Sequence, residues 1–179
     1  MKKYSLRRIA LISIMTALAI ALGVVESFIP SVGIPGVKFG LANILILLAM
    51  YELNVLDAAI ISIIKIFIVS LIRGTIFTMG FYMSLVGGIL SFLGMLLFVK
   101  CFKNFSPIAA SVIGAILHVT GQILIAIAFM ETPYIGYYLP VLGLIAIGTG
   151  ILVGLCVKGI MDSHIIPNIL KKYDNNEQI

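Results

Sequence analysis

Charged residues are scarce in this sequence. Asp, Glu, Lys and Arg make up 11% of the 179 residues, whereas hydrophobic residues make up 61%. Soluble domains have about 25% charged and about 45–50% apolar residues. A soluble fold of this length could not bury so much apolar surface, because a folded globule leaves much of its area in water. The composition therefore predicts an integral membrane protein and not a soluble enzyme.

Cysteine is also rare, and the common catalytic patterns are missing. Cys101 and Cys156 lie in no CxxC pair, so we expect neither a disulfide nor a metal centre. The phosphate loop GxxxxGK[ST] does not occur, which excludes ATP hydrolysis by that route. GxSxG, HExxH and the Asp-rich DDxxD, which would hold Mg²⁺ against a diphosphate, are absent too. We expect no catalytic residue and no cofactor.

Six apolar runs predict the fold class, an all-α bundle of about six transmembrane helices in one domain over residues 1–179. They cover residues 9–29, 41–51, 55–72, 75–99, 108–130 and 139–157, and a polar tail follows at 170–179. The first run resembles a signal peptide but lacks a small-x-small cleavage site, so we expect a retained helix. The second run is short. It either continues into the 52–56 region or forms a half-span that an irregular loop enters.

The distribution of basic residues predicts the orientation, because Lys and Arg gather on the cytoplasmic side of membrane proteins. Six spans with the N-terminus inside leave Lys38 and Arg73 as the two outer cations. The nine inner cations are Lys2, Lys3, Arg7, Arg8, Lys100, Lys103, Lys158, Lys171 and Lys172. We therefore predict a multi-pass protein of the cell membrane with both termini in the cytoplasm. We attribute the net charge of +5 to this topology, and we expect no nucleic-acid partner.

The segment from Glu26 to Gly40 has two prolines and three glycines, and a helix is predicted to begin just after it. Free N–H groups and the dipole at a helix start favour an anion. One interpretation is a ligand cap on the outer face that carries Glu26, Lys38 and Asn43. The alternative is a connecting loop in which Lys38 pairs with Glu26 or reaches lipid head groups.

Two cations occur on the third predicted helix. Lys65 lies about ten residues from either end of the run, which is too deep for a lipid-facing lysine, so it is expected to face the bundle. It either lines a binding site or forms a structural ion pair with Glu26 or Asp57. Arg73 lies about 80° away around the axis at the outer end. It is either a binding residue or an interfacial anchor.

Two further patterns involve residues four apart, which share a helix face. Gly114, His118 and Gln122 make a polar stripe of low volume, which can admit a ligand or let another helix approach closely. Ser13, Ala17 and Ala21 make a line of small residues on the first helix. That line either packs within the chain or docks onto a partner membrane protein.

Three stretches of the sequence resemble the Gx transporter family, which is also labelled heptaprenyl diphosphate synthase component I. They are ESFIPSVGIPGVKFGLAN (26–43), RGTIFTMGFYMSLVGGILS (73–91) and SVIGAILHVTGQ (111–122), and the likeness extends from about residue 8 to residue 160. In that family an Asn often follows the histidine, whereas Val119 stands there in this sequence. An identical set of polar contacts is therefore not implied.

The resemblance implies two alternative functions. The family is similar to the substrate-binding S components of energy-coupling factor importers, which capture a vitamin-like molecule and dock through an Ala-rich first helix onto a transmembrane coupling subunit with separate ATPases. Ser13, Ala17 and Ala21 then serve docking, and membrane lipids surround the subunit. The residues expected to contact the small-molecule substrate are Glu26, Lys38, Asn43, Arg73, Tyr82, His118 and Gln122. The alternative function is a membrane component of a heterodimeric prenyltransferase that makes heptaprenyl diphosphate.

Overall fold

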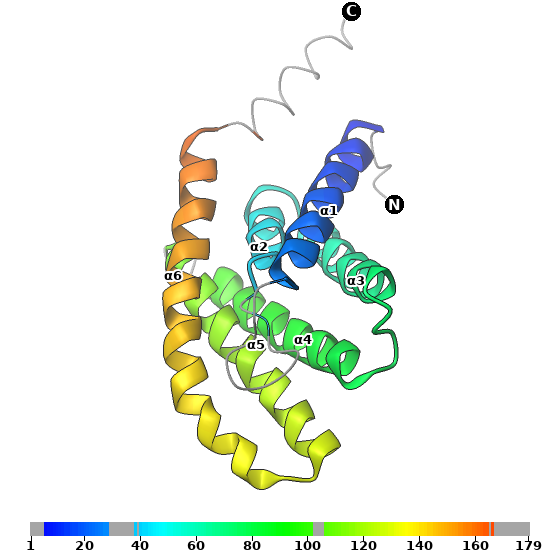
Figure 1. Ribbon diagram of the computed structural model, residues 1–179. Helices are drawn as coiled ribbons and strands as arrows, with labels where there is room; N and C mark the ends of the chain where they lie inside the picture. Colours follow the sequence, from blue (N-terminus) through cyan, green and yellow to red (C-terminus); the bar gives the residue numbers. More distant parts are fainter. Residues whose placement is uncertain (1–5, 29–37, 39, 102–105, 165, 167–179) are drawn as a thin grey trace, which may run out of the picture.

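The computed structural model describes residues 6–28, 38, 40–101, 106–164 and 166, so the predicted tail at 170–179 and most of the 29–39 loop lie outside the described residues. The described part of the chain contains helices and no strand, which confirms the all-α fold class (Figure 1). The six α-helices are α1 (Leu6–Glu26), α2 (Asn43–Glu52), α3 (Val55–Ile72), α4 (Met79–Cys101), α5 (Pro107–Met130) and α6 (Leu139–Asp162). A 3₁₀ helix that the sequence did not predict, η1 (Pro133–Tyr138), precedes α6.

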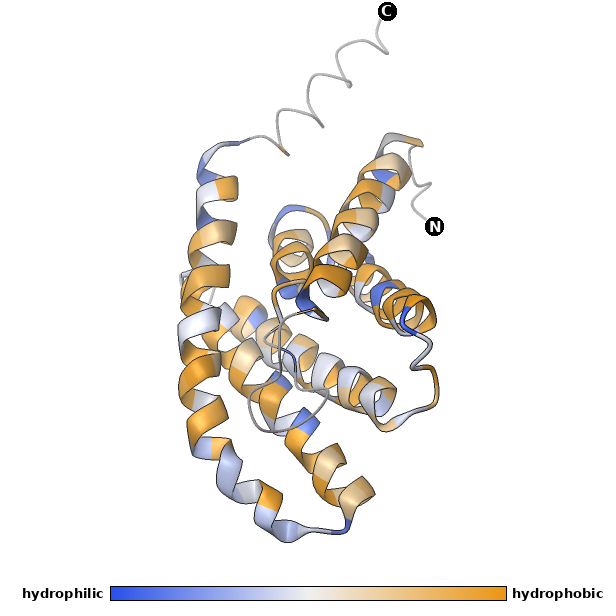
Figure 2. Cartoon of the chain, viewed as in Figure 1, coloured by the Kyte–Doolittle hydropathy of each residue, from blue (hydrophilic) through white to orange (hydrophobic). Residues whose placement is uncertain are grey.

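Five of these helices, α1, α3, α4, α5 and α6, are long and apolar enough to cross a membrane. Hydrophobic residues predominate along these helices (Figure 2), and many large hydrophobic side chains are exposed, with Leu71, Leu144 and Leu152 each more than 60% exposed. In water such a surface would aggregate, whereas in a bilayer it contacts lipid. The chain is therefore a multi-pass membrane protein, as the composition predicted.

The second helix is the short one. α2 has ten residues and ends at Glu52, and α3 begins at Val55, so the helix does not continue through the 52–56 region. Its residues from Leu45 to Met50 are all buried. α2 is thus a central helix shorter than the about 20 residues of a full span. The beginning of α1 and the end of α6 lie at the same end of the bundle (Figure 1).

The connection between α3 and α4 is longer than the two residues predicted. α4 begins at Met79 instead of residue 75, because residues 73–78 form a hydrogen-bonded turn. Thr75 N donates to Ser70 O, and Thr78 Oγ1 donates to Thr75 O. Gly74 has a φ of +62°, a conformation that glycine adopts without strain.

Glycines bring the backbones of α4, α5 and α6 close together. A Cβ added to Gly121 would lie 2.8 Å from Gly87 Cα, so α4 and α5 touch along their backbones there. Gly150 and Gly154 make the same kind of contact from α6, against Val112 and Ile108 of α5. Small residues allow this close packing in lipid, where helix association depends on van der Waals contact.

Candidate binding site

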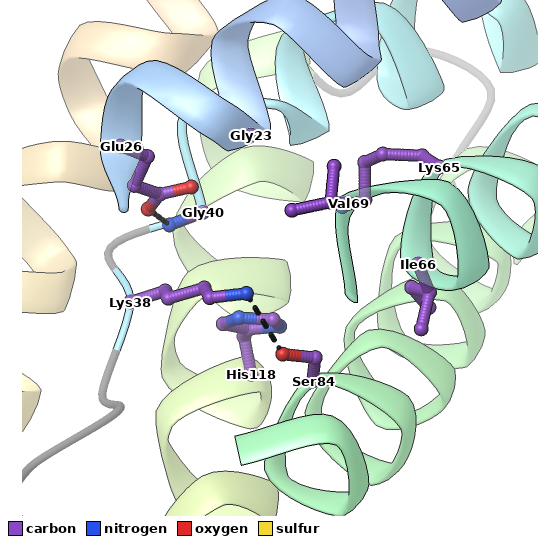
Figure 3. Close-up of a pocket in the computed structure, with 9 residues that line it drawn as sticks. All are labelled: Gly23, Glu26, Lys38, Gly40, Lys65, Ile66, Val69, Ser84 and His118. Atoms are coloured by element: carbon purple, nitrogen blue, oxygen red, sulfur yellow. Dashed lines mark hydrogen bonds between the residues drawn. The ribbon is translucent and has the colours of Figure 1, made fainter. Parts of the chain in front are cut away.

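A small polar cavity lies between the end of α1, the segment before α2, and the helices α3, α4 and α5 (Figure 3). The cavity lies toward the end of the bundle at which α1 ends, because residues of the last turn of α1 line it. Its volume is about 20 Å³, enough for about one water molecule. The residues that line it are Gly23, Glu26, Lys38, Gly40, Lys65, Ile66, Val69, Ser84 and His118.

Glu26 is the last residue of α1 and is buried. A carboxylate at a helix C-terminus meets the negative end of the helix dipole, which is unfavourable. Glu26 Oε1 offsets this by accepting hydrogen bonds from the backbone N–H groups of Gly40 and Leu41, just before α2 (Figure 3). The anion that the sequence predicted at this helix start is therefore the side chain of Glu26 itself.

Gly40 is required at this point for two reasons. Its φ is +83°, a backbone conformation that residues other than glycine rarely adopt. A Cβ at this position would also lie 3.0 Å from Asn43 Nδ2. The nitrogen Asn43 Nδ2 donates to Ser91 Oγ of α4 at 3.1 Å, so the start of α2 is fixed to α4. Asn43 does not line the cavity but supports the residues that do.

Lys38 does not pair with Glu26. Its ammonium donates to Ser84 Oγ of α4 at 3.0 Å, and its backbone N–H donates to Gln122 Oε1 of α5 at 3.3 Å. Burial is the main cause that lowers the pKa of the Lys38 ammonium to about 8, with the positive charges of Arg73 and Lys65 acting in the same direction and Glu26 in the opposite one. Lys38 is therefore a cation held among other cations by hydroxyl and amide groups.

His118 and Gln122 lie on one face of α5, as their spacing predicted. Their side chains are joined by a 3.3 Å contact between His118 Nε2 and Gln122 Nε2. His118 lines the cavity, and Figure 3 shows its ring beside the end of Lys38. Gly114, the third member of the predicted stripe, instead packs against Met95 of α4, so this face serves both cavity and helix packing.

Lys65 lines the cavity from α3 and is buried, with 9% of its surface exposed. Neither proposed ion pair forms among the described residues. Asp57 pairs with Arg8 of α1 at 2.5 Å instead, near the end of the bundle where α1 begins (Figure 1). A buried ammonium without a carboxylate at ion-pair distance is costly in a membrane protein, which favours a binding role over a structural one.

Four of the seven predicted site residues do not line the cavity, namely Asn43, Arg73, Tyr82 and Gln122. Arg73 is exposed at the C-terminal end of α3. Tyr82 is half-buried on α4, with its ring against Phe81 and Phe129 at centroid distances of 5.4 and 5.5 Å. Arg73 still acts on the cavity through its charge, because it lowers the pKa of Lys38.

Ser84 is a cavity residue that the sequence did not single out. Its hydroxyl donates to Gly80 O at 2.8 Å and accepts from Lys38 Nζ, so both of its hydrogen-bonding roles are used. A signal was present, because Ser84 and Ser91 are seven residues apart and so share a helix face. Gly87 and Gly88 lie between them in the sequence.

The line of small residues on α1 faces away from the bundle. Ser13, Ala17 and Ala21 are exposed, and the Ser13 hydroxyl donates only along its own helix, to Ile9 O at 2.9 Å. The opposite face of α1, with Met15 and Ala19, is buried in the core. Packing within the described part of the chain therefore does not account for the small residues.

The cavity chemistry suits an anion or a polar molecule more than a metal. Two lysines and a histidine face one carboxylate, and that carboxylate is already bound to backbone N–H groups. Within the described ranges, no three His, Cys, Asp or Glu side chains come together as metal ligands would. A ligand that binds here is therefore held by cationic, hydroxyl and amide donors.

Comparison with known proteins gives one family match. The family profile described as heptaprenyl diphosphate synthase component I matches residues 15–160, which is most of the chain and includes every cavity residue. No curated protein and no solved structure matches the chain.

Proposed function

The chain belongs to the heptaprenyl diphosphate synthase component I family, and we propose that it is the substrate-binding subunit of an importer of the energy-coupling factor type. The observation that carries this proposal is the charged cavity enclosed by membrane helices. Burying ionisable groups in a bilayer is costly, so such groups are retained where they bind a substrate or an ion. Lys38, Lys65 and His118 meet that description.

Ligand binding must change the contacts of Lys38. Pockets for small organic ligands hold about 300–1,000 Å³, whereas this cavity holds about 20 Å³. The Lys38 ammonium donates to Ser84 Oγ, and both residues line the cavity, so a ligand gains room by replacing this hydrogen bond. The same donor then binds the ligand, which limits the energetic cost of opening the site.

The exposed face of α1 supports a role as one subunit among several. Small residues allow another helix to approach closely, and Ser13, Ala17 and Ala21 leave such a surface open. We assign this surface to a transmembrane coupling subunit driven by separate ATPase chains, since the sequence has no phosphate loop of its own. The subunit then binds its substrate without catalysis.

Purification followed by mass spectrometry tests the binding role. The chain, extracted in a mild detergent, is expected to carry a small molecule that is lost from Lys38→Ala and from His118→Ala. His164→Ala, at an exposed histidine far along the chain after α6, serves as the control and should keep the ligand. Equal recovery of the ligand from all three variants would contradict the proposed site.

Co-purification tests the docking role. In cells that produce the complete importer, Ala17→Phe should lose the coupling subunit, because a phenyl ring prevents close helix contact. Ala128→Phe makes the same change on an exposed part of α5 and should retain the subunit. If Ala17→Phe retained it too, α1 would not be the docking helix.

The family description favours a second candidate function, in which the chain is the non-catalytic membrane component of a prenyltransferase. Mixing the purified chain with a Mg²⁺-dependent prenyltransferase subunit distinguishes the two. The importer function predicts no change in the rate of allylic diphosphate elongation. A chain that carries no small molecule and raises that rate would support the synthase instead.

A further inference from the structure

A second hollow lies next to the polar cavity and differs from it in chemistry. It is an apolar groove between α3 and α4 that holds about 390 Å³. Ala59, Ile63 and Phe67 line it from α3, and Leu85, Ile89 and Leu93 line it from α4. Ile63, Phe67, Ile89 and Leu93 are 43–55% exposed, so the groove opens on the apolar outer surface of the bundle.

Ile66 belongs to the lining of both hollows. Its side chain rests on α4, since a Cβ added to Gly88 would lie 2.8 Å from Ile66 Cδ1. Gly88 and Ile66 are both buried at the floor of the groove. Ile66 is therefore shared by a cavity lined by Lys38 and Lys65 and a groove whose lining is almost entirely hydrocarbon.

We propose that the bound molecule is an amphiphile, with an anionic head group in the polar cavity and an apolar tail that passes Ile66 into the groove. This rests on the proposed binding function and names its substrate class. The head group is placed by charge, because Lys38 and Lys65 line the cavity with only one carboxylate among the described lining residues, and neither lysine forms an ion pair with that carboxylate within the described ranges. The tail is placed by continuity, because the groove begins at the cavity wall.

The position of the cavity distinguishes this ligand from a bilayer phospholipid. Lys65 lies seven residues before Ile72, the last residue of α3, which is about 10 Å along the helix axis at 1.5 Å per residue. A phospholipid head group remains at the membrane surface, so a phospholipid can place a chain in the groove but not its phosphate in the cavity. A ligand whose head group enters the cavity therefore needs a small head group.

Binding of alkyl phosphates to the full chain in lipid nanodiscs tests the proposal. The probes are methyl, butyl and hexyl phosphate, and empty nanodiscs give the background for partition into lipid. Each methylene that leaves water for the groove should tighten binding about fourfold. Hexyl phosphate should then bind at least tenfold more tightly than butyl phosphate, and Lys38→Met should weaken every member of the series.

Variants that fill the groove provide the matched comparison. Ala59→Phe should abolish the dependence on tail length while methyl phosphate still binds, and Ala128→Phe on the outer face of α5 should keep that dependence. Ile63→Trp, at the exposed rim of the groove, repeats the test if Ala59→Phe does not fold. Affinity independent of tail length, or an equal response of Ala59→Phe and Ala128→Phe, overturns the proposal.

Two other outcomes would also overturn the proposal of an amphiphilic ligand. In the first, Lys38→Met keeps both the dependence on tail length and the affinity for alkyl phosphates. In the second, native mass spectrometry shows that hexyl phosphate does not displace nanodisc phospholipid. Either result makes the groove a lipid site, and the proposal fails. Failure of the importer function is recognised separately, by the absence of the coupling subunit in co-purification. A subunit that docks but shows no tail-length dependence keeps the importer function and loses only the amphiphile.

Discussion

The two halves of the bundle are held together in different ways. In α4, α5 and α6, glycines such as Gly87, Gly121 and Gly154 bring helix backbones into contact. In α1, α2 and α3, polar side chains make the ties, with Arg8 bound to Asp57 and Glu26 bound to the backbone before α2. Where the halves meet, α3 and α4 contact each other through Ile66 and Gly88 and line the apolar groove between them.

This difference shows where binding sites arise in a membrane bundle. Backbone contact leaves no room for a ligand, so the α4–α5 contact provides a fixed wall, from which Ser84 and His118 line the cavity. The other half contributes Glu26, Lys38 and Lys65, and a hydrogen bond from Lys38 to Ser84 joins the two halves at the cavity. The candidate site therefore lies at the boundary between a part packed by backbone and a part joined by polar groups.

The largest expected effect follows from removing a polar tie in the first half. Asp57 is fully buried, and Arg8→Met leaves its carboxylate without the guanidinium that binds it. Removing one member of a buried pair costs about 3–5 kcal/mol. We expect a loss of this size in the free energy of unfolding, measured by denaturation in mixed micelles. The double variant Arg8→Met with Asp57→Leu should recover most of it, and no recovery would contradict the importance of the pair.

In the second half the corresponding change is steric. A Cβ on Gly121 would meet the backbone of Gly87 at 2.8 Å, so Gly121→Leu must force α4 and α5 apart. Overpacking of this kind costs about 1–3 kcal/mol. Gly143→Leu on α6 is the control, since a Cβ there meets nothing within 4 Å. Equal thermal midpoints for the two variants would show that backbone contact does not hold this half.

Much of the fold could be predicted because hydrophobicity reports directly on membrane helices. The predicted run 55–72 coincides with α3, and the other runs fall on α1, α2, α4, α5 and α6 within a few residues. The turn before α4 was missed, because Thr75 and Thr78 read as part of an apolar run while their hydroxyl and backbone groups bond locally. Apolar composition does not show where a helix gives way to a turn.

The candidate site was less predictable, because spacing along one helix does not identify the neighbours of its side chains. Lys65 and Arg73 share a helix, yet one lines the cavity and the other is exposed. The alternative in which Lys38 or Lys65 pairs with Glu26 depended on charge alone. The structure shows instead that backbone N–H groups bind Glu26 and that the Ser84 hydroxyl binds Lys38. Such partners are specified by helix packing, which the sequence does not state.

A smaller effect concerns ligand affinity at the boundary between the halves, which is expected to depend on pH. Since the pKa of Lys38 is lowered to about 8, the side chain is charged below that pH and loses its proton as the pH rises through it. An anionic ligand such as hexyl phosphate should therefore bind several-fold more weakly at pH 9 than at pH 7. Lys38→Arg, whose guanidinium stays protonated, should remove this step. A pH step of equal size in both proteins would assign it to another group.

The smallest expected effect concerns the one hydrogen bond by which Asn43 joins α2 to α4. Ser91→Ala removes the acceptor of the Asn43 amide and leaves that amide buried, which costs about 1 kcal/mol. The loss should lower the thermal midpoint slightly and also weaken ligand binding, because Asn43 supports Gly40 and hence the backbone that binds Glu26. Ser13→Ala is the control, since its hydroxyl bonds within α1 on an exposed face. If Ser91→Ala lowered stability but left ligand affinity unchanged, the polar ties between the halves would hold the fold without shaping the cavity.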